Sequence, residues 1–300
     1  MTARRLAGVL APITTPFDGA TGDVASERLC GNVRRLLAAG LDGVVVAGST
    51  GESALLDSDE QRRMVAWTRD AVPAERWLVA GTGGESTRQA VALTRAAAEA
   101  GADAVLVRPP SYYFASISPP SLAEYYHAVA DQSPVPVLVY NIPKYTHLTV
   151  AAALLEQLAA HPNIVGVKDS SGDIGNLGAY RKAVPAWSVL VGSGSLLCPA
   201  LELGCDGGIL AVACFAAPLC AGIFGAFRRG DRDGARLLQA RLTPLDKEIV
   251  GKLGPAGVKA AMDAVGDGLY GGPVRAPLAQ IAASDRQRIA GLVDAAGPLV

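Results

Sequence analysis

The sequence has little cysteine, little histidine and no excess of either charge. Its five cysteines are an odd number and include no Cys-x-x-Cys pair, which argues against a disulfide framework and against a zinc site. The 27 basic and 28 acidic residues give a net charge of −1, which offers no basic field for nucleic acid or for an anionic membrane. We therefore expect the partners to be small molecules or other protein chains, with no nucleic acid and no membrane.

Long apolar runs are also absent. No run reaches the length of a membrane span, and Pro12, Pro16 and Asp18 interrupt the first apolar stretch before it resembles the core of a signal peptide. Together with the cysteine usage, this favours a reducing compartment, so we expect a cytoplasmic protein. No three histidines or carboxylates have the spacing of metal ligands, and we expect no metal cofactor.

What the sequence does contain is a series of short apolar runs that alternate with segments of helical periodicity. The runs lie at residues 9–13, 43–46, 77–80, 104–107, 135–140, 164–168, 188–191 and 208–213. Eight such strands alternating with helices predict a parallel sheet closed into a (β/α)8 TIM barrel. An open doubly wound sheet is the alternative, but no glycine-rich nucleotide fingerprint follows the first strand.

Helix signals accompany these strands and continue beyond them. Ser26 is the expected N-cap of the first helix. After the eighth unit, residues 232–250, 255–265 and 285–295 show helical patterns. We expect residues 1–230 to form the barrel and residues 231–300 to form a C-terminal helical extension packed on it as a single structural unit.

The run at 164–168 ends in a lysine, Lys168, which is followed by small polar residues. Desolvation of an ammonium without a partner favours the neutral amine, and a neutral amine can form a Schiff base with a ketone or aldehyde. The alternative is a structural ion pair with Asp169 or another carboxylate. The residues by themselves leave both interpretations open.

Two other strand ends carry groups that a Schiff-base site needs. Gly48-Ser49-Thr50-Gly51-Glu52-Ser53 follows the second strand, and its small residues let backbone N–H groups approach a carboxylate. Tyr140 ends the fifth strand. A buried tyrosine commonly satisfies its hydroxyl locally, but imine chemistry requires a proton donor and acceptor beside the lysine.

Five motifs, in order and approximate spacing, resemble the dihydrodipicolinate synthase / N-acetylneuraminate lyase family of pyruvate-dependent class I aldolases. They are Gly48-Ser49-Thr50-Gly51-Glu52, Tyr112-Tyr113, Tyr140-Asn141-Ile142-Pro143, Gly166-Val167-Lys168-Asp169 and Gly207-Gly208-Ile209. Within the family, the segments at 84–87, 168–173, 262–263 and 271–278 are most similar to 4-hydroxy-2-oxoglutarate aldolase.

The resemblance implies catalytic roles for four residues. Lys168 would form the Schiff base with pyruvate, and Tyr140 would act as the acid and base. Thr50 would relay protons between Tyr140 and Tyr113, with Tyr113 coming from a neighbouring subunit. Because the covalent imine carries the chemistry, no cofactor is implied. The family is commonly a dimer of dimers, so we expect a homotetramer.

The resemblance also implies how the substrate is held. Ser49, Thr50 and Gly51 would bind the pyruvate carboxylate, Ile209 would pack against the imine, and Ser170 would contact the distal end of the substrate. Tyr145 and His147 are further candidates at the cavity mouth.

One position departs from the synthase pattern. Dihydrodipicolinate synthases carry an arginine two residues past the proline of Tyr-Asn-x-Pro, where this chain has Tyr145. Without a guanidinium fork a bidentate carboxylate contact is lost, which argues against the synthase activity. Arg275 matches another family position, where we predict a structural ion pair.

Three functional hypotheses follow. The first is a class I aldolase for 4-hydroxy-2-oxoglutarate, which would give pyruvate and glyoxylate, or for a related 2-keto-3-deoxy acid. The second is a dehydratase of a 2-keto-3-deoxy acid on the same imine, which would release no pyruvate. The third is a non-catalytic barrel, which the intact set of Lys168, Tyr140, Thr50 and Tyr113 disfavours.

Overall fold

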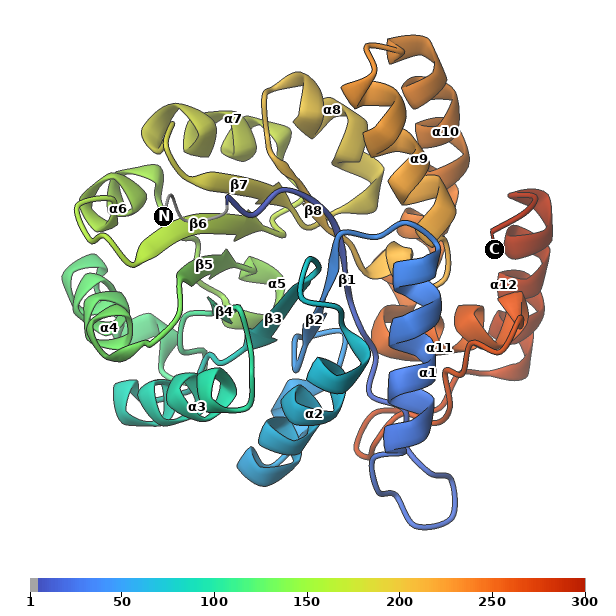
Figure 1. Ribbon diagram of the computed structural model, residues 1–300, viewed down its shortest axis with the longest axis horizontal. Coiled ribbons are helices and arrows are strands. Elements are labelled where there is room, and N and C mark those ends of the chain that lie inside the picture. The colour runs from blue at the N-terminus through green and yellow to red at the C-terminus, as the bar shows by residue number, and fades with distance from the viewer. Residues whose placement is uncertain (1–4, 300) are drawn as a thin grey trace.

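The computed structural model describes residues 5–299, and within them eight parallel strands close into a barrel in chain order (Figure 1). The strands are β1 (Gly8–Pro12), β2 (Gly43–Val46), β3 (Trp77–Gly81), β4 (Ala104–Val107), β5 (Val137–Asn141), β6 (Ile164–Asp169), β7 (Ser188–Val191) and β8 (Gly207–Ile209). The predicted (β/α)8 barrel is therefore confirmed.

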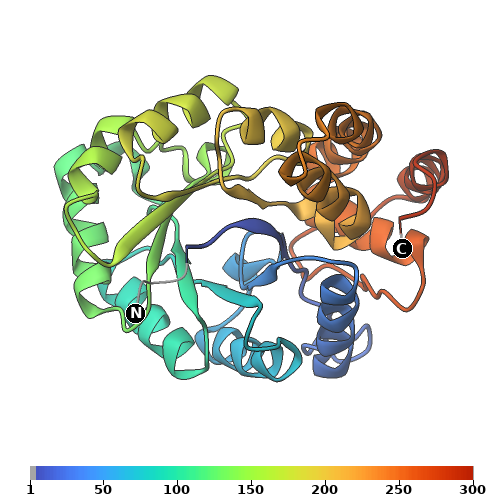
Figure 2. The same ribbon diagram turned by 45° about the horizontal axis from the view of Figure 1, so that its top comes forward.

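Helices follow each strand and form a ring outside the barrel (Figure 2). They are α1 (Ser26–Ala38), η1 (Ser53–Leu55), α2 (Ser58–Ala71), α3 (Thr87–Glu99), η2 (Phe114–Ser116), α4 (Pro119–Gln132), α5 (Pro143–Thr146), α6 (Ala152–Leu158), α7 (Ile174–Ala183), η3 (Gly194–Leu196), α8 (Leu197–Glu202), η4 (Ala211–Cys214) and α9 (Ala217–Arg228). The C-terminal extension adds α10 (Arg232–Leu245), the π-helix η5 (Asp246–Gly251), α11 (Lys252–Val265) and α12 (Ala283–Ala295). No helix within residues 5–299 is long and apolar enough to cross a bilayer.

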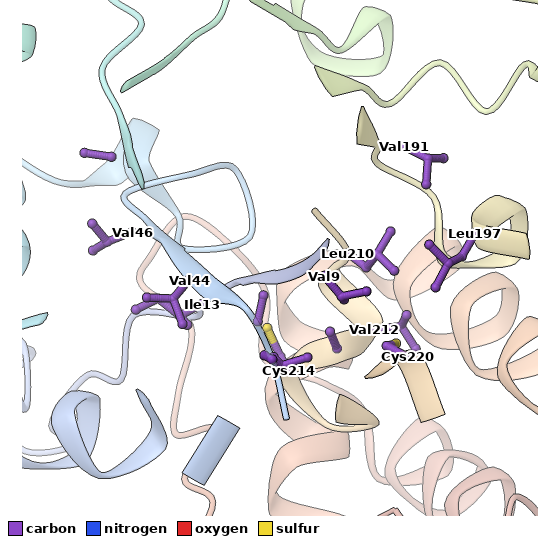
Figure 3. Packing of buried hydrophobic residues seen from close by; sticks show 14 of the residues in the cluster. Val9, Ile13, Val44, Val46, Val191, Leu197, Leu210, Val212, Cys214 and Cys220 are labelled. Carbon is purple, nitrogen blue, oxygen red and sulfur yellow. The ribbon is translucent and has the colours of Figure 1, made fainter. Parts of the chain in front are cut away.

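Alternate residues of each strand belong to two separate buried clusters, because successive side chains point to opposite faces of a sheet. Residues such as Leu10, Val45 and Leu138 form the smaller cluster, which fills the barrel. Their sequence neighbours, such as Val9 and Val44, pack outward against the helices. Figure 3 shows part of this outer cluster around β1, β2, β7 and the segments that follow β7 and β8.

Closure of the barrel depends on a close approach between β8 and β1. Gly207 has φ +145°, and a Cβ there would lie 1.9 Å from the carbonyl oxygen of Gly8. Only glycine fits this position without displacing the backbone of β1. The glycine at the start of β8 is thus a requirement of closure.

Several predicted boundaries were wrong. Ala25, not Ser26, is the N-cap of α1, and no side chain caps this helix. The predicted strand at 208–213 ends at Ile209, because the buried segment from Ala211 forms the 3-10 helix η4. Residues 210–214 are apolar because they pack in the core, and burial alone does not distinguish a strand from a helical turn.

The C-terminal extension lies along the barrel beside α1 and α9 (Figures 1 and 2). Lys259 of α11 forms an ion pair with Glu52 of the β2–η1 loop at 2.5 Å, and both side chains are buried. Arg275 forms an ion pair with Glu60 of α2 at 2.7 Å, as predicted from the sequence. These contacts join the extension to the barrel, whereas a domain boundary at residue 230 stays a prediction.

Candidate active site

Strand register brings Tyr140 and Lys168 together. Tyr140 of β5 and Lys168 of β6 are direct partners in the parallel ladder, so both side chains point to the same face. Tyr140 belongs to the cluster that fills the barrel, which identifies this face as the inner one. Both residues stand near the carboxyl ends of their strands, where barrel enzymes place their catalytic groups.

The two side chains are in contact and almost completely buried. Nζ of Lys168 donates a hydrogen bond of 3.2 Å to the Tyr140 hydroxyl and lies 4.3 Å from the centre of its ring. The exposed fractions are 4% for Lys168 and 6% for Tyr140. This geometry gives the amine a neighbouring group that can give or take a proton.

No ion pair of the described chain includes Lys168, so the structural alternative for this lysine is wrong. The neighbouring carboxylate of Asp169 is used elsewhere, since it accepts hydrogen bonds from the Asn141 amide at 2.7 Å and from the Ser171 hydroxyl at 2.7 Å. Asn141 in turn accepts a hydrogen bond from the backbone N–H of Val150. Asp169 therefore organises the loop after β6 and leaves the amine without a carboxylate.

A cavity of about 210 Å³ opens over the Lys168 amine at the carboxyl ends of the strands. Five of the predicted site residues besides the lysine and Tyr140 line it, namely Ser49, Thr50, Ser170, Ile209 and Tyr145. The cavity is large enough for a small oxo acid. These segments, far apart in sequence, meet because strand ends of a closed barrel converge on one rim.

The loop after β2 presents unused hydrogen-bond donors to this cavity. Within the described residues, neither the hydroxyl nor the backbone N–H of Ser49 or Thr50 takes part in a hydrogen bond. By contrast, the N–H of Gly51 donates to the Gly48 carbonyl, and Gly51 does not line the cavity. Two hydroxyls and two amides are thus available to a carboxylate, whereas Gly51 shapes the turn.

This loop is conformationally strained. Ala47 has φ +53° and Glu52 has φ +58°, a region that residues other than glycine occupy at a cost of about 1–3 kcal/mol each. A Cβ at Gly81 would lie 2.2 Å from the Ala47 carbonyl oxygen, so β3 approaches the loop closely. The buried Glu52 side chain accepts a hydrogen bond from the N–H of Arg275 and pairs with Lys259. The C-terminal extension therefore holds the loop in place.

Besides Gly51, two predicted residues, Tyr113 and His147, lie outside the cavity of the described chain. Tyr113 is 72% exposed and lies outside the cavity, with its ring against Tyr112. No hydrogen bond of the described chain joins Thr50 to Tyr140 or to Tyr113. His147 has φ +57° and packs against Phe114 at 5.0 Å between ring centres, outside the cavity. Tyr145 does line the cavity and is half-exposed. Its pKa is raised, mainly by partial burial and to a smaller extent by the charge of the nearby Tyr140.

The segment that carries Tyr112 and Tyr113 is held by Glu85. Its carboxylate accepts hydrogen bonds from the backbone N–H groups of Ser111 and Tyr112 and forms an ion pair with Arg108 at 2.9 Å. Burial by itself raises the pKa of Glu85, but these N–H groups, the Ser111 hydroxyl and Arg108 outweigh it and lower the pKa to about 2. The carboxylate is ionised at neutral pH and fixes the exposed tyrosines.

Sequence reasoning missed four polar residues of the cavity wall. Asp246 of η5, Ser193 after β7, Ser171 after β6 and Lys144 of α5 all line it. The Lys144 ammonium donates to the Gly251 carbonyl at 3.2 Å. No local pattern in the sequence marks Asp246, because it reaches the cavity only through the path of the extension.

Residues 5–299 contain no group of three or more His, Cys, Asp or Glu side chains that could hold a metal ion.

A closed (β/α)8 barrel with a buried, unpaired lysine and a partner tyrosine at its catalytic rim defines a class I aldolase, a carbon–carbon lyase. Comparison with known proteins identifies the family within this class. The sequence matches the dihydrodipicolinate synthetase family over residues 5–296, and the chain belongs to that family.

Curated relatives extend over nearly the whole chain. A DapA-like lyase of Halobacterium salinarum is 39% identical over 94% of this chain and 91% of its own. The 4-hydroxy-tetrahydrodipicolinate synthase of Methanospirillum hungatei is 36% identical over 94% of this chain and 96% of its own. Synthase 1 of Streptomyces coelicolor is 37% identical over 97% of this chain and 93% of its own.

Solved structures agree with the same assignment. A prophage protein of the dihydrodipicolinic acid synthase family from E. coli K12, crystallised with pyruvate, superimposes with a TM-score of 0.92 at 28% identity, covering 98% of this chain and 99% of its own. The synthase from Cyanidioschyzon merolae, crystallised with lysine, gives a TM-score of 0.91 at 29% identity, covering 98% and 99%.

Proposed function

We propose that this chain is a Schiff-base-forming, pyruvate-dependent lyase that cleaves or forms a 4-hydroxy-2-oxo acid. The observation that carries the proposal is the Lys168 amine, buried, free of carboxylates and 3.2 Å from the Tyr140 hydroxyl over a cavity. The chemistry needs no metal or organic cofactor, because the protonated imine is itself the electron sink.

In the cleavage direction, the Lys168 amine attacks the C2 ketone of the substrate, and loss of water gives the protonated imine. Tyr140 then accepts the proton of the C4 hydroxyl, the C3–C4 bond breaks, and its electron pair moves into the imine to give an enamine. The aldehyde leaves, C3 takes up a proton, and water hydrolyses the imine to pyruvate and the free lysine. Synthesis follows these steps in reverse.

The rest of the cavity would orient the oxo acid. The unused hydroxyl and N–H groups of Ser49 and Thr50 support binding of the C1 carboxylate opposite Lys168. Ile209 is completely buried in the cavity wall and would pack against the imine. Ser170, whose hydroxyl makes no hydrogen bond in the described chain, would contact the distal part of the substrate.

We propose that Tyr113 acts in a neighbouring subunit. Its ring is 72% exposed, yet its loop is fixed by Glu85, an arrangement suited to insertion into another chain. Thr50 would then link Tyr140 to the partner's tyrosine as a proton relay, within a cytoplasmic homotetramer. His147, which lies outside the cavity near the same loop, would act only after such assembly.

Four assignments of substrate and reaction compete at this site. The closest resemblance in the sequence favours 4-hydroxy-2-oxoglutarate, and a 2-keto-3-deoxy acid is a related possibility. The names of the relatives favour 4-hydroxy-tetrahydrodipicolinate synthesis, although Tyr145 stands where synthases carry an arginine. A dehydratase of a 2-keto-3-deoxy acid would share the imine but would release no pyruvate.

Trapping with borohydride tests the central step. Wild-type protein incubated with pyruvate and borohydride should gain the mass of one reduced pyruvyl group per chain, and Lys168→Ala should gain none. Absence of an adduct on the wild type would refute the proposal. Pyruvate release from 4-hydroxy-2-oxo acids then separates the aldolase from the dehydratase.

A further inference from the structure

Asp246 is a charged residue of the cavity wall that the proposed reaction does not use. It is 6% exposed, and none of the ion pairs in the described chain includes it. Its Oδ2 accepts hydrogen bonds from the Ser195 N–H at 2.8 Å and from the Ser193 hydroxyl at 3.0 Å. Its Oδ1 accepts none from the described residues. Oδ1 is not among the fully buried atoms without a partner, so it keeps some solvent access, and because Asp246 lines the cavity, a donor on a bound ligand can reach it.

The barrel topology places Asp246 on the β7 side of the cavity, away from the Ser49–Thr50 loop. Lys168 lies next to the last residue of β6, and the Ser49–Thr50 loop follows β2, the strand opposite β6 in the eight-membered order. A substrate bound through C2 to the lysine, with its C1 carboxylate at Ser49 and Thr50, directs its remaining carbons toward the other walls. Asp246 is bonded to the segment after β7, next to β6, so it lies on that distal side.

The charge of Asp246 distinguishes two kinds of distal group. A hydroxyl can donate a hydrogen bond to Oδ1 and satisfy it. A carboxylate has no donor at neutral pH and would meet a like charge in a buried setting. The cavity wall contains no arginine that would offset this repulsion, and the only other cations in it are Lys168 and Lys144.

We propose that Asp246 selects substrates whose aldehyde half carries hydroxyl groups, which makes this a lyase of 2-keto-3-deoxy sugar acids. The assignment rests on the proposed Schiff-base function and refines it. In the synthesis direction the pyruvate enamine attacks the carbonyl carbon of a hydroxyaldehyde, Tyr140 protonates the new C4 alkoxide, and hydrolysis of the imine frees the product. The hydroxyl beyond C4 donates to Oδ1 of Asp246.

Lys144 is the basis of the rival assignment, because its ammonium could hold a distal carboxylate. It is exposed, however, and its Nζ is already bonded to the Gly251 carbonyl at 3.2 Å. Binding there would leave the Asp246 Oδ1 unsatisfied. The rival predicts that glyoxylate is the preferred aldehyde and that Lys144→Gln loses activity with it.

The test compares kcat/KM for glyceraldehyde, glyoxylate and propanal with pyruvate, using the full-length wild-type protein. Glyceraldehyde should be preferred over both others. In Asp246→Asn the ratio of glyceraldehyde to glyoxylate should fall by about 10- to 100-fold, the loss expected for a hydrogen bond to a charged group. If Asp246 had only a structural role, its replacement would lower kcat/KM for both aldehydes equally and would leave their ratio unchanged.

Controls separate this inference from the proposed function. Asp233→Asn removes a carboxylate that is 95% exposed on α10 and should keep the wild-type ratio. A wild type that traps pyruvate with borohydride but prefers glyoxylate would overturn the Asp246 assignment alone. A wild type that traps no pyruvate would overturn both proposals. Should Asp246→Asn fail to fold, the wild-type preference for glyceraldehyde over propanal and glyoxylate still decides the matter.

Discussion

The surroundings of two buried lysines, Lys168 and Lys259, differ in the one respect that determines what a lysine does. Lys259 is 1% exposed, pairs with Glu52 at 2.5 Å and donates to the Pro273 carbonyl at 2.6 Å. Lys168 is 4% exposed, has no carboxylate partner and contacts a tyrosine hydroxyl over a cavity. Both lysines are therefore buried, but only Lys259 has a carboxylate partner and only Lys168 faces the cavity.

The difference teaches that burial alone does not identify a nucleophile. Burial lowers the pKa of Lys259, and the Glu52 carboxylate opposes that shift, so the pair is a structural bond between the β2–η1 loop and α11. A lysine without such a pair, at the rim of the barrel, is available for covalent chemistry. The pairing also fixes Ser49 and Thr50, so the structural lysine supports the site of the reactive one.

Replacement of Lys168 should have the largest effect. In Lys168→Met we expect turnover to fall by more than about 10³-fold, because the nucleophile is lost. Stability to urea should be unchanged or slightly higher, because no carboxylate is left unpaired. Steady-state kinetics and borohydride trapping measure the loss of turnover, and urea unfolding measures the stability. Retained turnover would refute the role of this lysine.

Removal of the Tyr140 hydroxyl tests the proton-transfer step beside Lys168 separately from formation of the imine. In Tyr140→Phe, kcat should fall by about 10²- to 10⁴-fold, while the pyruvate adduct still forms on Lys168. Tyr126→Phe is the matched control, because that buried hydroxyl donates to the Val107 carbonyl and does not line the cavity. The control should lose about 0.5–1.5 kcal/mol of stability and keep its kcat. Equal effects on kcat would contradict a catalytic role for Tyr140.

Replacement of Lys259 should reverse the pattern seen for Lys168. Lys259→Met leaves the Glu52 carboxylate buried and unpaired, which should lower the free energy of unfolding by about 3–5 kcal/mol. The folded variant should still trap pyruvate. Adding Glu52→Gln should recover part of the lost stability, as urea unfolding of the double variant would show. A folded Lys259→Met that forms no adduct would break the distinction between the two lysines.

Replacement of Glu85 should have the smallest effect on stability, because its carboxylate is more exposed than that of Glu52. Its pKa is lowered to about 2 in the folded chain from an ordinary value of 4.5, so its contribution to stability is complete above 4.5 and is lost as the pH falls toward 2. Because the side chain is 42% exposed, we expect Glu85→Gln to cost less than about 1 kcal/mol at neutral pH. Urea unfolding should show a smaller difference in stability between the wild type and Glu85→Gln at pH 3 than at pH 7. An equal difference at both pH values would contradict the lowered pKa of Glu85.

The sequence was sufficient for the parts of the site that lie on strands. Lys168 and Tyr140 each end an apolar run, and both stand on the catalytic rim of the barrel as predicted. The same reasoning extended the last strand too far, to residue 213, because it could not separate a buried 3-10 turn from a strand. It also placed His147 at the cavity mouth, whereas the ring packs on Phe114.

Contacts between distant segments could not be predicted. Asp246 reaches the cavity because the chain continues from α10 into the π-helix η5 and bonds to the segment after β7. The ion pair between Glu52 and Lys259 joins residues that are far apart in the sequence. Neither has a local signal, since hydrophobic periodicity describes only the neighbourhood of a residue.

The sequence by itself determined the alternation of strands and helices and the lysine at a strand end. These properties follow from side-chain periodicity and are encoded within a few residues. Only the tertiary structure decided that Tyr140 lies opposite Lys168, that this amine has no carboxylate, and that Asp246 enters the cavity. Register and long-range pairing depend on how distant segments pack, which no single segment specifies.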